Sequence, residues 1–323
     1  MKRYLGFLFV MLIAFGCNET NGPDKISPKE IHEIINYLAS DGLKGRRVGS
    51  EGIDLAATYA ETLFKTSGIK PYYETYRDNF RINDSLEAFN VIGVLEGIDP
   101  LLKNEIVMLG AHYDHIGQGQ LIKKFKGTLT NIDSIANGAN DNASGTAMVM
   151  ALAKHLAMVK NNKRTLMFVL FSGEEFGLKG SKHLSERLKN EGLNLYTMLN
   201  FEMMGVPFTD GRTYDVFLTG YDLSNMAEKI NAYSSSNVLG KSEVSVKYNL
   251  FKRSDNYPFY TAFQVPCQTI ASCDMTNYDF YHHVDDEADK QDYNHMAHVA
   301  NTLIPAIATI CNSEIQEIKM NDE

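Results

Sequence analysis

The sequence predicts an α/β fold in three layers (α/β/α), with a central, mostly parallel but mixed sheet between two layers of helices. Short apolar runs rich in β-branched residues alternate along the chain with amphipathic segments of helical period. This alternation is typical of parallel strands joined by crossover helices. No linker rich in Pro, Gly or Ser and no internal repeat divides the 323 residues, so we expect one large domain over residues 28–318.

Each element is predicted from its own periodicity. Between residues 52 and 66, for example, Leu55, Tyr59 and Leu63 recur at helical spacing. The predicted helices are Pro28–Leu38, Gly52–Thr66, Ser144–Val159, Gly180–Asn190, Leu223–Tyr233 and Lys290–Cys311. The predicted strands are Phe89–Leu95, Glu105–Leu109, Thr165–Phe171, Tyr196–Phe201, Tyr214–Thr219 and Gln264–Ala271. In sheets of this kind ligands bind beyond the carboxyl ends of the strands.

The N-terminus has the pattern of an export signal. Lys2 and Arg3 precede the apolar run Tyr4–Phe15, which is too short to span a bilayer. Gly16 and Cys17 at its end resemble a bacterial lipobox, although the two residues before them depart from the usual pattern. We expect cleavage after residue 16, lipidation of Cys17, a tether over residues 17–27 and an exported protein attached to a membrane through the lipid. Cleavage by ordinary signal peptidase and a retained anchor are the alternatives.

Composition excludes some partners. The net charge of −9, the pI of about 5.5 and the absence of a basic stripe argue against nucleic acid. Beyond Cys17 the chain has Cys267, Cys273 and Cys311, an odd number. A bridge between Cys267 and Cys273 and free buried thiols both remain open. The sequence leaves the oligomeric state undetermined.

Five segments place a histidine or a carboxylate shortly after an apolar run. They are Gly110–His115 (GAHYDH), Gly138–Gly145 (GANDNASG), Phe171–Gly177 (FSGEEFG), Asn200–Gly205 (NFEMMG) and Tyr281–Asp286 (YHHVDD). Imidazole nitrogen and carboxylate oxygen are ligands that zinc prefers, and two ions need about five ligands with one carboxylate shared. Most of the segments follow predicted strands, so they should meet at one edge of the sheet. The sequence therefore predicts a two-metal hydrolase.

The candidate ligands of the first two segments also have simpler interpretations. His112 could be an ordinary core histidine, but Asp114 two residues later could orient its ring as a metal ligand. His115 is expected to be solvated or to line a loop rather than to bind metal. Asp141 could simply be a turn residue, because Asn and Asp favour turns. As a metal ligand it would bridge two ions about 3.5–4 Å apart.

The other three segments also have simpler interpretations. The adjacent carboxylates of Glu174 and Glu175 repel each other, so they would be an unusual pair without a cation nearby. Their proximity is explained if one binds metal and the other, pointing elsewhere, transfers a proton. A lone glutamate such as Glu202 is usually on the surface, yet its apolar flanks indicate a buried partner. Only one of His282 and His283 can face a metal if the segment is extended.

Together these motifs resemble the M28 metallopeptidases, an aminopeptidase-type family with co-catalytic zinc ions. The likeness runs from about Ile31 to Pro305. Besides the five segments it includes Leu38–Gly52 (LASDGLKGRRVGSEG) and Arg253–Phe259 (RSDNYPF), followed by the Val265-Pro266 pair. The combination is specific, although no single motif would be.

The resemblance implies roles for individual residues. His112, Asp141 and Glu202 match the ligands of one zinc, and Asp141, Glu175 and His282 match those of the other. Glu174 matches the general base that takes a proton from a metal-activated water during peptide hydrolysis. Removal of N-terminal residues from peptides is the implied activity. Tyr281 matches a position that stabilises the oxyanion in some members, and Arg253 and Tyr257 are candidates for contact with substrate.

Some positions depart from the family pattern. Glu202 stands where many relatives have aspartate, and Asn256 stands where a histidine often follows the Ser-Asp pair. Residues 118–136 form a polar insertion that is a candidate rim or lid. Two rival functions share the fold: a glutaminyl-peptide cyclase and a non-catalytic binding domain. The chain has no tryptophan, on which the pockets of the cyclases rely, and every expected ligand position carries a competent residue.

Overall fold

The computed structural model describes residues 25–118 and 134–322. The predicted signal segment, Cys17 and most of the tether and insertion lie outside these residues. The helices are α1 (Pro28–Leu38), α2 (Glu51–Thr66), α3 (Gly145–Val159), α4 (Lys179–Asn190), α5 (Met226–Ser234), α6 (Glu243–Lys247), α7 (Asn256–Phe263) and α8 (Tyr293–Asn312). The strands are β1 (Lys70–Pro71), β2 (Arg77–Asn83), β3 (Leu86–Leu95), β4 (Glu105–His112), β5 (Gly117–Gln118), β6 (Ile135–Ala136), β7 (Thr165–Phe171), β8 (Asn194–Glu202), β9 (Val216–Leu218), β10 (Leu239–Gly240) and β11 (Cys267–Ala271).

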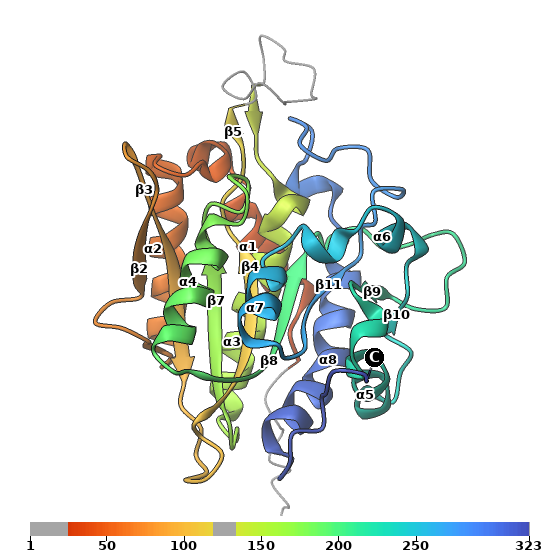
Figure 1. Ribbon diagram of the computed structural model, residues 1–323. Coiled ribbons are helices and arrows are strands. Elements are labelled where there is room, and N and C mark those ends of the chain that lie inside the picture. Colours follow the sequence, from red (N-terminus) through yellow and green to blue (C-terminus); the bar gives the residue numbers. More distant parts are fainter. Residues whose placement is uncertain (1–24, 119–133, 323) are drawn as a thin grey trace, which may run out of the picture.

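The central sheet has the order β1-β3-β7-β4-β8-β11-β9-β10, with β2 paired to β3 outside this path. Strands β7, β4, β8 and β11 are parallel to one another and form the middle of the sheet. Strands β3 and β9 join this parallel core antiparallel, one on each side. The predicted α/β fold with a mixed central sheet is confirmed (Figure 1).

The central strands are buried on both faces, which explains their nearly continuous apolar sequences. In β4, Val107 and Leu109 belong to the larger core cluster, which also contains side chains of α1, α2, α3 and α8. Met108, between them, belongs to a second cluster with side chains of α4 and α7. Because successive side chains of a strand point to opposite faces, one strand serves both layers. Figure 1 shows α4 and α7 in front of the sheet and α3 behind it.

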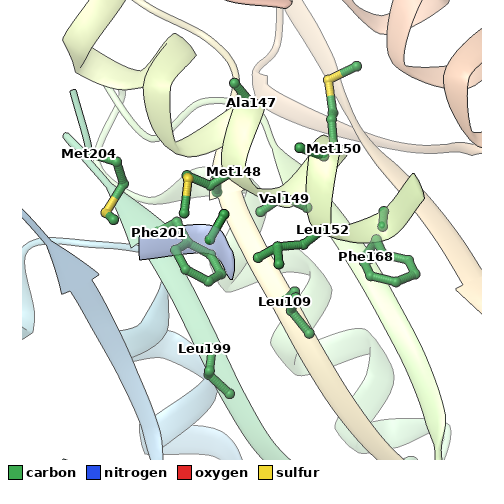
Figure 2. Close-up of a cluster of buried hydrophobic side chains, with 14 of the residues drawn as sticks. Leu109, Ala147, Met148, Val149, Met150, Leu152, Phe168, Leu199, Phe201 and Met204 are labelled. Carbon is green, nitrogen blue, oxygen red and sulfur yellow. The ribbon is translucent and has the colours of Figure 1, made fainter. Parts of the chain in front are cut away.

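Helix α3 packs across the middle of the sheet in the larger cluster. Figure 2 shows side chains of α3 meeting Leu109 of β4, Phe168 of β7 and Phe201 of β8. Each of these three strand residues is fully buried. A fully buried Leu, Phe or Met side chain contributes on the order of 1.5–3 kcal/mol to folding. This packing fixes the start of α3 against the carboxyl ends of the strands. It also fixes the segment just before α3, Ala139–Ser144, which carries Asp141 and is called the Asp141 loop below.

The structure adds elements that periodicity did not reveal. Strand β2 is polar and pairs at the sheet edge, so its sequence lacks an apolar run. Helix α7 contains Pro258, but in the first turn, where the missing N–H costs no helical hydrogen bond. The fold also begins before Pro28, since Ile26 is buried and its backbone bonds the side chain of Asn301.

Two further findings concern membranes and disulfides. Across residues 25–118 and 134–322, α8 and the other helices all lack the combined length and hydropathy needed to cross a bilayer. The buried thiols Cys267, Cys273 and Cys311 are free, so the alternative of a Cys267–Cys273 bridge is wrong.

Candidate metal centre

The parallel strands bring the predicted donors to one edge of the sheet. His112 is the last residue of β4, Glu202 is the last residue of β8, and Glu175 follows β7. The Nε2 atom of His112 lies 3.4 Å from Oδ1 of Asp141, which precedes α3. On the other side, Nε2 of His282 lies 3.2 Å from Oδ2 of Asp141. All five donors therefore meet around Asp141.

These side chains form two clusters that share Asp141. The first contains His112, Asp141 and Glu202, with Oε1 of Glu202 3.9 Å from Nε2 of His112. The second contains Asp141, Glu175 and His282 together with His115, and Oε2 of Glu175 lies 3.1 Å from Nε2 of His282. Because the first cluster faces Oδ1 and the second faces Oδ2, Asp141 has the arrangement of a carboxylate that bridges two cations.

The chemistry of the two clusters fits divalent cations. In the part of the chain that the structure describes, Nε2 of His112, Nε2 of His282 and Oδ2 of Asp141 are buried without hydrogen-bond partners. Buried polar atoms left unpaired in this way cost free energy. Burial raises the pKa of Glu202 to about 7, and burial also raises the pKa of Glu174 well above its usual value. A cation would satisfy the donor atoms and offset the clustered negative charge.

Asp114 positions its neighbours mainly through its backbone carbonyl. The ring of His112 places Nδ1 3.1 Å from the carbonyl oxygen of Asp114 and 3.8 Å from its carboxylate. The carboxylate instead accepts the backbone N–H of Glu174 at 3.2 Å. Burial raises the pKa of Asp114 to about 7. The backbone carbonyl of Asp114 thus orients the His112 ring, whereas the sequence analysis expected the Asp114 carboxylate to do so. The carboxylate instead holds the loop that carries Glu174.

The Asp141 loop is held by residues that the sequence analysis did not single out. The carboxylate of Asp286 accepts the backbone N–H of Asn140 at 2.8 Å and that of Asp141 at 3.0 Å. The side chain of Asn142 donates to the carbonyl of Phe201 and accepts the N–H of Met203, which ties the loop to the strand that ends at Glu202. The peptide bond between Asp141 and Asn142 is cis.

Arg46 joins three segments beneath the site. Its fully buried guanidinium donates to the carbonyl oxygens of Leu38, Tyr113, Asn137 and Gly138 at 2.5–2.9 Å. Burial lowers the pKa of Arg46 to about 10. Hydrogen bonds from a charged donor are roughly twice as strong as neutral ones, so Arg46 ties the His112 and Asp141 loops to the end of α1. Arg46 lies in the LKGRRVGS part of the Leu38–Gly52 segment, and this resemblance to the family was the only sequence feature that pointed to it.

Asp255 is a further buried carboxyl group whose charge acts on residues of the site. Asp255, just before α7, is fully buried, and burial raises its pKa to about 6. Its charge acts on Asp114, Glu174 and Glu202, whose pKa values it raises. Asp255 belongs to the same Arg-Ser-Asp segment as Arg253, and this was the sequence signal that could have revealed it.

A cavity opens beside the first cluster. Three carboxylates, Asp141, Glu174 and Glu202, line it together with Tyr281 and Arg253. Its apolar part is lined by Met203, Phe217, Leu250, Ala271, Cys273 and Met275. Tyr257 does not line this cavity; its ring packs with Phe251 and Tyr260. Of the two candidates for contact with substrate, Arg253 therefore lines the cavity and Tyr257 does not; the contacts themselves stay predictions.

His115 differs from its prediction. Its side chain is fully buried rather than solvated, and its Nδ1 lies 3.0 Å from Oε1 of Glu175 and 3.8 Å from Oδ2 of Asp141. His283, in contrast, turns away from the clusters toward Asp285 and Phe280, so only His282 of that pair faces the site. His282 itself has a positive φ of 56°, so the segment is not extended there.

Sequence comparison identifies relatives of this chain. A probable zinc metalloprotease of Pyrenophora teres f. teres is 30% identical over 206 residues, which cover 59% of this chain and 42% of that protein. A probable leucine aminopeptidase of Trichophyton verrucosum is 27% identical over 271 residues, covering 79% of this chain and 63% of that protein. The chain thus spans less than two thirds of the length of these relatives.

Solved structures share the fold. The aminopeptidase from Aneurinibacillus sp. strain AM-1 superposes with a TM-score of 0.67 at 16% identity, covering 92% of this chain and 97% of that one. The glutaminyl cyclase of Fimbriiglobus ruber superposes equally well, with a TM-score of 0.67 at 18% identity, covering 88% and 97%. The family model of peptidase family M28 matches residues 90–307. Because this match covers more than half of the sequence, the chain belongs to peptidase family M28.

Proposed function

We propose that this protein is an aminopeptidase that uses two zinc ions, one in each cluster. The observation that carries the proposal is the position of Asp141, whose two carboxylate oxygens face two separate groups of ligands. Membership of peptidase family M28 supports peptide hydrolysis. The relative described as a probable leucine aminopeptidase supports action at the N-terminus of peptides.

The proposed chemistry assigns a role to each residue. His112, Asp141 and Glu202 would hold one ion, and Asp141, Glu175 and His282 the other. Bound zinc lowers the pKa of water and polarises a carbonyl group. Glu174 lines the cavity next to Asp141 and Glu202, and there it accepts the proton of the attacking water and returns it to the leaving amine. Tyr281, whose ring stacks on His282 at 4.0 Å between centroids, donates its O–H to the developing oxyanion.

The lining of the cavity supports action on free N-termini. Its polar part carries the carboxylates of Glu174 and Glu202, which attract a protonated α-amine. Its other part is apolar, formed by side chains such as Phe217, Leu250 and Met275. We infer that the first residue of the substrate places its amine near the carboxylates and an apolar side chain in this part of the cavity.

A matched panel of substrates tests this proposal. We expect Leu- and Met-p-nitroanilide to be hydrolysed, and N-acetyl-Leu-p-nitroanilide to react at least ~100-fold more slowly, because its neutral amide leaves the carboxylates without a partner. The measurement is kcat/KM at constant zinc concentration. Equal rates for the free and acetylated substrates would contradict aminopeptidase action and favour an endopeptidase.

The same panel separates hydrolysis from cyclisation. A glutaminyl-peptide cyclase would release ammonia from Gln-peptides and leave Leu-peptides intact. The lack of tryptophan and the presence of a second ligand cluster favour hydrolysis. Ammonia release from Gln-peptides in the absence of Leu-peptide hydrolysis would contradict the proposed peptidase.

We further propose that the protein is exported and held to a membrane by lipid on Cys17. The support is the pattern of the first seventeen residues, in which two basic residues are followed by an apolar run and then by Gly16 and Cys17. In a bacterial host the full-length protein should partition into the membrane fraction, and Cys17→Ser should lose the lipid and the mass that it adds. A Cys273→Ser variant serves as the control for loss of a cysteine. Unchanged lipid labelling in Cys17→Ser would contradict the assignment.

A further inference from the structure

We propose that His115 is a fourth protein ligand of the ion held by Asp141, Glu175 and His282, so that the two ions differ in their number of protein donors. The inference rests on the proposed two-metal function and deepens it. With His115, the second cluster offers four donors and the first offers three.

The distances within the second cluster fit a single ion. One donor atom from each of His115, Asp141, Glu175 and His282 lies within 4.8 Å of every other. Donors held at 2.0–2.2 Å around a tetrahedral zinc lie roughly 3.3–3.6 Å apart. Nδ1 of His115 lies 3.0 Å from Glu175 and 3.8 Å from Asp141, a spread like that of the other contacts in the site. The imidazole therefore occupies the position of a ligand.

The burial of His115 calls for a partner. Its side chain is fully buried, and neither ring nitrogen has a hydrogen-bond partner among the described residues. Although Nδ1 lies 3.0 Å from Oε1 of Glu175, the two atoms are not aligned as donor and acceptor. Buried polar atoms without partners destabilise the folded state. A shared cation would satisfy both Nδ1 of His115 and Oε1 of Glu175.

The backbone makes room for this ring. Gly138 has a φ of +61°, and a Cβ atom there would lie 2.5 Å from Cγ and Cδ2 of His115. The backbone N–H of His115 points to the carbonyl of Arg46 at 3.4 Å, and Arg46 in turn bonds the carbonyls of Tyr113 and Gly138. The segment after β4 is thus fixed on both sides of His115, which holds the ring against the second cluster.

The two sites then have different roles. Zinc sites that serve structure are closed by four protein ligands, whereas catalytic sites keep a position open for water or substrate. Asp141, Glu202 and Glu174 line the cavity, but His115 and Glu175 do not. The Glu202 side chain is 19% exposed, against 8% for Glu175 and none for His115. The His115 site would therefore bind its ion more tightly and first, and the His112 site would receive the substrate.

Zinc titration of the full chain tests the inference. The purified protein is stripped of metal and titrated with Zn²⁺ against a chromophoric chelator. The wild type should bind one equivalent more tightly than the second. His115→Ala should weaken the tighter equivalent by at least ~100-fold, since loss even of residues that only support a ligand costs 10–100-fold. His115→Cys, which restores a zinc donor, should recover most of the affinity. His298→Ala, at an exposed histidine, is the control.

Each outcome decides between ligation and a structural role. Wild-type affinity for both equivalents in His115→Ala would overturn the inference, as would a His115→Cys variant no tighter than His115→Ala. If His115→Ala does not fold, zinc X-ray absorption of the wild type decides: three imidazoles over two ions support His115 as a ligand, and two overturn it. If His115→Ala binds zinc more weakly while the zinc-loaded wild type cleaves no peptide, this inference is supported and the proposed function is contradicted.

Discussion

Glu174→Gln should keep both metal ions and lose nearly all turnover. The amide has the size of the carboxylate but cannot accept the proton of the attacking water. General base catalysis contributes about 10²–10⁴-fold, so kcat/KM should fall by at least that factor. Metal content, measured by elemental analysis, should remain that of the wild type, because Glu174 lies beside the two ligand clusters and belongs to neither.

The control for Glu174→Gln is Glu186→Gln, the same change on the exposed side of α4. It should leave both activity and metal content unchanged. Activity of Glu174→Gln within a few-fold of the wild type, at equal metal content, would contradict the assignment of Glu174 as the base. A loss of both activity and metal would indicate that Glu174 is a ligand instead.

His112→Ala and His282→Ala should fail through loss of metal. Each histidine belongs to only one of the two clusters, so each variant should lose affinity for one ion and retain the other. The cost should exceed the 10–100-fold that is typical for residues that only support a ligand. Metal content after dialysis against a weak chelator should fall toward one equivalent, and kcat/KM should fall with it.

The two histidine variants should also differ from each other. His112 contacts the three-ligand cluster beside the cavity, while His282 contacts the cluster that includes His115. High zinc concentration should therefore rescue His282→Ala more readily, because three donors remain there. His298→Ala is again the control. Two undiminished equivalents of zinc in both variants would contradict the ligand assignment.

Much of the site could be predicted from sequence because parallel strands end at one edge. The apolar runs end near Leu109, Phe171 and Phe201, and the polar residues shortly after these positions must then lie close together. In the structure β7 ends at Phe171, whereas β4 and β8 continue to the donors His112 and Glu202. Helix α1 and strand β7 have the bounds that periodicity predicts. The alternation of elements gave the fold class, since each buried strand and amphipathic helix carries its own period.

Other parts depend on contacts that have no local pattern. The polar edge strand β2 is fixed by pairing with β3. Asp286 and Arg46 act through backbone atoms far away in sequence, so their residue types alone reveal no role. The sequence predicts that His115 is solvated or lines a loop, because nothing in the GAHYDH segment itself indicates that its ring is buried. Its burial results from Arg46 and Gly138, which hold that loop against the site.

The presence of two zinc ions that share Asp141 can be tested directly by a crystal structure of the zinc-loaded protein with anomalous diffraction data at the zinc edge. We expect two peaks about 3.5–4 Å apart, one on each side of the Asp141 carboxylate. One peak should lie next to His112 and Glu202, and the other next to Glu175 and His282. A single peak, or peaks that do not contact Asp141, would contradict a site in which two ions share this carboxylate.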